Sequence, residues 1–125
     1  MTSRVLAVAV DALDAESLAA FWRSVLGGTV DRWSDARGVR YVELAVPGGG
    51  PSVLFQSVSE PRPGKNRVHL DVAPKTGEQA DEVARVVALG ATVLGDEPDL
   101  PWVVLADPEG NEFCILPPRA LGDGA

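Results

Sequence analysis

The sequence predicts an α+β fold assembled from two βαβββ modules, and three observations carry this prediction. The phrase Val25–Val30 (Val-Leu-Gly-Gly-Thr-Val) returns in the second half as Ala88–Val93 (Ala-Leu-Gly-Ala-Thr-Val). Each copy ends a segment with helical periodicity and begins a strand. Each is then followed by two apolar runs joined by a turn, the pattern of a hairpin. The two copies begin sixty-three positions apart. A repeat of about 60 residues is too long for a solenoid unit and too short for a stable independent domain, so we expect one domain of paired modules.

The first module is predicted over residues 1–58. Its first strand is Val5–Val10, a continuous apolar and β-branched run typical of a strand buried on both faces. Asp14 is a good N-cap for the helix that follows, and Gly27 or Gly28 can end it. The apolar stripe of this helix consists of Leu18, Phe21, Trp22, Val25 and Leu26. The hairpin consists of Val39–Val46 and Ser52–Val58.

The second module is predicted over residues 67–120, after a linker at 59–66 and before a tail at 121–125 that we expect to be frayed. Its first strand is Arg67–Ala73. Thr76 and Gln79 have the spacing of a capping box. The expected helical stripe consists of Ala80, Val83, Ala84, Val87 and Leu89, ended by Gly90.

The last hairpin of the second module consists of Trp102–Ala106 and Glu112–Leu116. Between them, Asp107-Pro108-Glu109-Gly110 places Asp, Pro and Gly where a type I turn prefers them.

Composition restricts location and partners. No apolar run approaches the length that crosses a bilayer, and a single cysteine fits a reducing compartment, so we expect a cytoplasmic protein. The net charge is −7, and the basic residues are scattered apart from Arg62, Lys65 and Arg67 in the linker. Because nucleic acids and anionic membranes select basic faces, we expect neither as a partner.

The alternation of side chains along the strands predicts a polar face that no helix covers. In Arg67–Ala73, for example, Val68 and Leu70 would face the helix, and His69 and Asp71 would face away. The same alternation collects seven residues on this face: Tyr41, Glu43, Gln56, His69, Asp71, Glu112 and Cys114. Small neighbours such as Ala7 and Ala9 favour a concave pocket wall, although a plain solvated sheet face has the same pattern.

Three segments carry a resemblance to a known superfamily: Leu13–Trp22, Val68–Val72 and Leu105–Phe113. Together they are similar to the vicinal oxygen chelate superfamily, which includes glyoxalases, bleomycin-resistance proteins and extradiol dioxygenases, and most resemble its small glyoxalase-like members. The resemblance implies that the two modules form a half-open β-barrel cup with the helices on the outer face. It also implies a homodimer, which exposed edge strands would favour.

The metal site that the resemblance implies is not retained. In this superfamily the ligands come from the first and fourth strands of each module. The matching positions here are Ala7 (or Leu6, if the register slips by one), Leu54, His69 and Cys114. Only His69 and Cys114 carry donor atoms, with Glu112, Gln56 or Asp71 as substitutes, so we expect no metal and no other cofactor.

Several individual residues admit two interpretations. His69, the only histidine, is either a hydrogen-bonded residue on a strand face or a general base with Glu112 as a catalytic partner. Cys114 is either a small buried apolar residue or a pocket residue. Trp22 belongs to the core, whereas Trp33 and Trp102 lie near strand starts and could form an aromatic rim.

Two classes of function follow, beside a scaffold without retained chemistry. The first is a metal-independent small-molecule-binding protein with a polar and aromatic cup that sequesters its ligand. The second is a small lyase, isomerase or hydrolase that uses His69 as general base. An apolar, aromatic-lined cavity favours the binding protein, and a His–carboxylate pair aimed into the cavity favours the enzyme. The residues predicted to contact the ligand are Trp33, Tyr41, Glu43, Gln56, His69, Asp71, Trp102 and Cys114.

Overall fold

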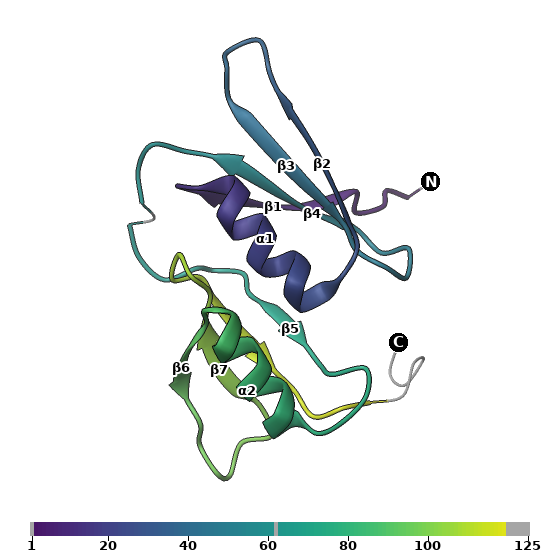
Figure 1. Ribbon diagram of the computed structural model, residues 1–125, viewed down its shortest axis with the longest axis vertical. Helices are drawn as coiled ribbons and strands as arrows, with labels where there is room; N and C mark the ends of the chain where they lie inside the picture. Colours follow the sequence, from purple (N-terminus) through teal and green to yellow (C-terminus); the bar gives the residue numbers. More distant parts are fainter. Residues whose placement is uncertain (1, 62, 120–125) are drawn as a thin grey trace. The chain divides into compact units, whose positions relative to one another are not determined.

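The computed structural model describes residues 2–61 and 63–119, and the chain forms two compact units divided between Pro63 and Gly64 (Figure 1). This boundary lies inside the predicted linker. The elements are β1 Ala7–Ala12, α1 Ala15–Leu26, β2 Thr29–Ser34, β3 Arg40–Ala45, β4 Ser52–Ser57, β5 Leu70–Val72, α2 Gln79–Leu89, β6 Thr92–Gly95, β7 Val103–Ala106 and β8 Glu112–Ile115. The predicted α+β class and its two βαβββ modules are confirmed. The predicted tail at 121–125 lies outside the described residues.

The first module contains a four-stranded sheet in the order β1-β4-β3-β2, with α1 against one face (Figure 1). Strand β1 runs parallel to β4, and the other two pairs are antiparallel. Because a parallel pair cannot be joined by a tight turn, the chain crosses over through α1 between β1 and the hairpins. The buried apolar residues of this module include Leu18, Phe21, Trp22, Val42, Leu44, Val53 and Phe55.

Both predicted ends of α1 are confirmed. The Asp14 carboxylate accepts a hydrogen bond from the Ser17 backbone N–H at 3.1 Å, which satisfies one of the unpaired donors of the first turn. Gly27 and Gly28 both have positive φ. A Cβ on Gly28 would also collide with the carbonyl oxygen of Ala45, so only glycine fits where the helix turns into β2.

The second module repeats this topology with the strand order β5-β8-β7-β6. Its first strand is shorter than predicted, because β5 begins only at Leu70. The Asn66 side chain donates to Asn111 Oδ1 at 3.0 Å, and the chain bends at Arg67 and Val68 before it joins the sheet. The prediction that Val68 faces the helix is therefore wrong: its side chain is 74% exposed.

Helix α2 differs from the sequence prediction in its N-terminal cap and in the residues that it buries. The residue before it, Glu78, makes no side-chain cap, and the capping box from Thr76 to Gln79 does not form. Instead, Gln79 Nε2 donates to the carbonyl oxygens of Pro101 and Ile115 at 2.9 and 2.8 Å. The residue of α2 that is buried in the core is Val86. The predicted stripe is wrong, since Ala80, Ala84, Val87 and Leu89 are exposed.

Neither helix among the described residues has the length and apolar character that a membrane crossing requires.

Candidate functional site

The face of the second sheet opposite α2 contains a cavity of about 410 Å³. One part of its wall is aromatic and aliphatic, and another part carries ionisable side chains. The lining residues are Lys65, His69, Asp71, Trp102, Val104, Glu112, Phe113, Cys114 and Leu116. All of them belong to the second of the two compact units, which begins at Gly64 and includes Lys65 from the predicted linker.

Strand register explains how these side chains come together. Val104 on β7 lies opposite Cys114 on β8, and Cys114 lies opposite Asp71 on β5, so the three form one row across the sheet. The alternate residues of β8, Phe113 and Ile115, are buried in the core. The predicted alternation therefore holds for β8, and it places the Cys114 side chain on the cavity face.

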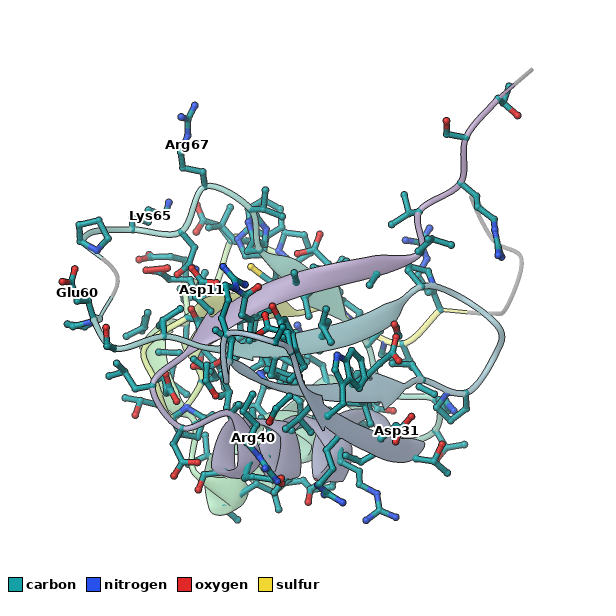
Figure 2. The ribbon with its side chains drawn as sticks, turned by 90° about the horizontal axis from the view of Figure 1, so that it is seen from above. Asp11, Asp31, Arg40, Glu60, Lys65 and Arg67 are labelled. Atoms are coloured by element: carbon teal, nitrogen blue, oxygen red, sulfur yellow. The ribbon has the colours of Figure 1, made fainter. Side chains whose placement is uncertain are left out.

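The segment before β5 is fastened beside this cavity. The backbone N–H of Asn66 donates to Glu112 Oε2 at 3.4 Å, in addition to the side-chain bond to Asn111. Asn111 in turn donates to the Asp107 carboxylate, which organises the predicted turn: the Gly110 N–H donates to the Asp107 carbonyl at 2.8 Å. These bonds hold Lys65 at the cavity wall, whereas the Arg67 side chain extends away from the ribbon (Figure 2).

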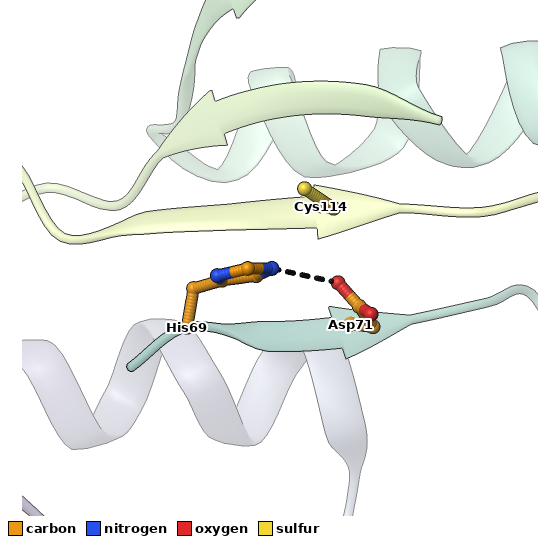
Figure 3. Close-up of side chains that lie close together, drawn as sticks. All are labelled: His69, Asp71 and Cys114. Atoms are coloured by element: carbon orange, nitrogen blue, oxygen red, sulfur yellow. Dashed lines mark ion pairs between the residues drawn. The ribbon is translucent and has the colours of Figure 1, made fainter. Parts of the chain in front are cut away.

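His69 and Asp71 form an ion pair at the cavity wall. His69 Nε2 lies 3.2 Å from Asp71 Oδ1, and both side chains point to the same side of their strand (Figure 3). Each side chain is about half exposed, so water and small solutes reach the pair. A carboxylate in this position can accept a hydrogen bond from the imidazole and thereby orient the ring.

Cys114 lies across from this pair on β8, and the donor atoms of Cys114, His69 and Asp71 are all within 4.8 Å of one another. Burial, and to a smaller degree the Asp71 carboxylate, raise the pKa of the Cys114 thiol above its usual value. A thiol with a raised pKa is a poor nucleophile at neutral pH. The Cys114 side chain therefore contributes a small, weakly polar surface to the cavity.

The metal site implied by the resemblance does not fit this chain. Ala7 and Leu54 have hydrocarbon side chains, so β1 and β4 contribute no donor at the matching positions. In the remaining cluster of His69, Asp71 and Cys114, an ion would have to displace the proton shared by His69 and Asp71 and the proton of a thiol whose pKa is raised.

Two of the predicted aromatic residues, Trp33 and Tyr41, form a stack in the first module. They are direct partners across β2 and β3, with ring centroids 5.6 Å apart and planes 14° from parallel. The Tyr41 hydroxyl donates to Asp35 at 2.9 Å, and the Arg37 guanidinium donates to the same oxygen at 2.8 Å. Hydrogen bonds from Arg37, and then from the Val39 N–H and Tyr41, lower the pKa of Asp35 to about 2.

The structure groups five of the predicted site residues in one cavity: His69, Asp71, Trp102, Glu112 and Cys114. The other four, Trp33, Tyr41, Glu43 and Gln56, belong to the first module. Glu43 there accepts a hydrogen bond from the Ser52 hydroxyl at 2.6 Å. The residues predicted to contact the ligand thus include an aromatic pair that is already stacked and a carboxylate that is already paired.

Four residues of the cavity wall were not among the predicted site residues: Lys65, Val104, Phe113 and Leu116. Alternation along β7 could have identified Val104, because its neighbours Val103 and Leu105 are buried. Lys65 carries no such signal: the side-chain and backbone bonds of Asn66 bring it to the cavity.

Comparison with known proteins agrees with this architecture. The profile of the family described as "Glyoxalase-like domain" matches residues 7–116. The chain belongs to this family. It is thereby a member of the vicinal oxygen chelate superfamily, as the sequence resemblance implied. A search of curated proteins found no significant match.

Solved structures share the fold at low sequence identity. The fosfomycin resistance protein FosX of Listeria monocytogenes, solved with Mn(II) and a dihydroxypropylphosphonic acid, has a TM-score of 0.77 at 13% identity, covering 99% of this chain and 98% of FosX. Leishmania major glyoxalase I has a TM-score of 0.72 at 14% identity, covering 92% and 86%. TnmS3, an antibiotic binding protein from Streptomyces sp. CB03234, has a TM-score of 0.68 at 23% identity, covering 94% and 98%.

Proposed function

We propose that this protein binds a small organic molecule, without a metal, in the cavity of its second module. The observation that carries the proposal is the cavity itself. Its volume of about 410 Å³ lies in the range of ordinary ligand sites. It also has the composition of such sites, with apolar walls and a few convergent polar groups.

The charges around the cavity favour a cationic or aromatic ligand. Asp71 and Glu112 are acidic, Lys65 is basic, and the protein as a whole carries a net charge of −7. Trp102 is 39% exposed and offers a ring face to a planar group or an ammonium ion. TnmS3 supports binding as a role for this fold, because it is described as an antibiotic binding protein.

Metal independence rests on Ala7 and Leu54, which remove two of the four ligand positions of the superfamily. FosX was solved with Mn(II), so the same fold can hold a metal when its donors are present. We propose that this chain uses the corresponding face for direct contacts with an organic ligand. The homodimer remains part of the proposal, and light scattering that gives a 13 kDa species at high protein concentration would contradict it.

The direct test is binding of benzylamine, a small aromatic cation, followed by the NMR signals of His69 and the Trp102 indole. His69 is the only histidine, so its ring signals need no assignment by mutation. We expect saturable shifts of both residues. Asp71→Asn should weaken binding several-fold. Asp31→Asn, at an exposed carboxylate on β2, should leave it unchanged. Equal weakening in both variants would mean that benzylamine binding depends on the net charge of the protein and not on the position of Asp71.

A second candidate function is supported by the His69–Asp71 ion pair. A histidine oriented by a carboxylate at the edge of a cavity can act as a general base, with Glu112 in the same wall as an acid or a second base. Hydrolysis of p-nitrophenyl acetate tests the hydrolase form of this candidate. His69→Gln should then abolish nitrophenolate release above background while benzylamine still binds. Release that is unchanged in His69→Gln would exclude His69 as the base.

A further inference from the structure

A second cavity, of about 260 Å³, adjoins the first on the same sheet. Trp102 and Val104 belong to the linings of both cavities, so the two spaces lie on either side of these residues. The second cavity contains none of the residues of the His69–Asp71 ion pair. Its other lining residues are Leu94, Gly95, Glu97 and Leu100, and it is mainly apolar.

Gly95 contributes no side chain to the space of the second cavity. Gly95 lies opposite Val104, so it extends the row of Asp71, Cys114 and Val104 to the edge strand β6. The register between β6 and β7 shifts between Val93 and Gly95, which marks a bulge. A Cβ built on Gly95 meets no atom within 4 Å, so the space above this residue is open.

Trp102 divides the two cavities from a fixed backbone position. The residue before it, Pro101, accepts a hydrogen bond from Gln79 at the start of α2, and the residue after it, Val103, begins β7 and is buried. The indole itself is 39% exposed. A side chain with an anchored backbone and an exposed ring can change rotamer without disturbing the sheet.

We propose that the two cavities form one elongated site for a two-part ligand. The cationic or hydrogen-bonding end lies at Asp71 and His69, and an aromatic or aliphatic end passes Trp102 and lies over Gly95 against Leu100. The proposal rests on the proposed function and adds the class of ligand: an elongated amphiphile with a polar head and an apolar tail. The continuous row of Asp71, Cys114, Val104 and Gly95 across the four strands supports a single site. Its polar end is at Asp71, and its end without a side chain is at Gly95.

The test compares two amines that share a head group. Benzylamine fills the polar end alone, and 4-phenylbenzylamine adds a second ring. For the unmodified protein we expect the longer amine to bind at least about tenfold more tightly, since burying an aromatic ring contributes more than the free energy of one tenfold step. Gly95→Leu should remove this advantage and leave benzylamine binding unchanged, because the new side chain fills only the second cavity.

Gly50→Leu is the matched control. Gly50 lies in the loop before β4, its Cβ would also meet no atom within 4 Å, and its φ is likewise outside the left-handed region. We expect this variant to keep the full advantage of the longer amine. If Gly95→Leu fails to fold, Leu100→Ser makes the same test, because Leu100 is a surface-exposed wall of the second cavity.

The outcomes separate the two proposals. Equal affinity of the two amines for the unmodified protein, or an advantage that persists in Gly95→Leu or Leu100→Ser, would overturn the two-part site and leave the proposed function intact. Binding of neither amine would overturn the proposed function together with this extension. Loss of benzylamine binding in Gly95→Leu would also contradict the proposal, because the polar end would then depend on the second cavity.

Discussion

The two modules share one topology but differ in what their sheets do with polar side chains. In the first module Tyr41 is bonded to Asp35 and stacked on Trp33, and Glu43 is bonded to Ser52. In the second module the corresponding face has Val104 and Cys114 in its middle and a cavity above them. The same fold therefore gives one sheet with a stacked aromatic pair on this face and one whose paired polar groups lie at a cavity wall.

The two helices differ in how many of their residues are buried. Helix α1 buries five residues, whereas α2 buries Val86 alone. Both helices begin with a fixed contact, the Asp14 cap in α1 and the Gln79 bonds in α2. The second module has its own buried core, to which its strands contribute Val103, Leu105, Phe113 and Ile115 and its helix only Val86. We infer that the first module contributes most of the stability and the second most of the ligand contacts.

The largest expected effect tests the stability side of this comparison. Leu18 in α1 is 1% exposed, and Leu89 in α2 is 39% exposed. Leu18→Ala should destabilise the protein by about 2–5 kcal/mol, because it leaves a cavity in the core. Leu89→Ala should change stability by no more than about 0.5 kcal/mol. Urea unfolding followed by circular dichroism measures both, and similar losses would remove the distinction between the helices.

The next prediction tests the binding side with two tryptophans of equal exposure. Trp33 is 40% exposed and Trp102 is 39% exposed, but only Trp102 lines the cavities of the second module. Trp102→Ala should weaken 4-phenylbenzylamine binding by about tenfold, since one large aromatic contact is lost. Trp33→Ala should leave the dissociation constant unchanged. A matching loss in Trp33→Ala would restore the aromatic rim that the sequence predicts from both modules.

Local patterns in the sequence were sufficient for most of the fold. Asp14 identified the start of α1, and the turn at Asp107–Gly110 formed as predicted. Helix α2 was harder, because its valines and alanines are spread around the helix and periodicity alone does not choose a face. The contacts that anchor the start of α2, from Gln79, also depend on carbonyl oxygens far away in the sequence.

The candidate site was predictable only in part, for a similar reason. His69 and Asp71 are two residues apart, so alternation places them on one face, and the register of β8 adds Cys114. Lys65 lies at the cavity beside Asn66, whose hydrogen bonds to Asn111 and Glu112 cannot be predicted from a local sequence pattern. Gly95 could have been noticed, because a glycine inside a strand often marks a bulge.

A smaller effect, confined to the first module, is expected at low pH. The folded-state pKa of Asp35 is lowered from 3.8 to about 2, so folding favours its carboxylate form. The contribution of Asp35 to the stability of the folded protein is therefore present above the pKa of the unfolded state. It is lost as the pH falls from about 4 through 2. The near-UV circular dichroism of the Trp33–Tyr41 stack should follow this loss. Asp35→Asn should show a weaker signal without the acid step, and an unchanged step in that variant would assign the titration to another group.

The smallest expected effect is the response to metal ions. Ala7 and Leu54 supply no donor atoms, so the first module contributes nothing at the positions that the superfamily uses. In the second module, an ion would have to displace the proton of Cys114, although burial and Asp71 raise the pKa of that thiol, and the proton between His69 and Asp71. We therefore expect elemental analysis to find no stoichiometric zinc, nickel, manganese or iron, and equimolar zinc to leave the melting temperature unchanged. About one ion per chain that disappears in Cys114→Ser would contradict this, because zinc requires a thiolate there. The cavity face of the second module would then be a metal site, and the proposal that this module binds an organic ligand without a metal would be wrong.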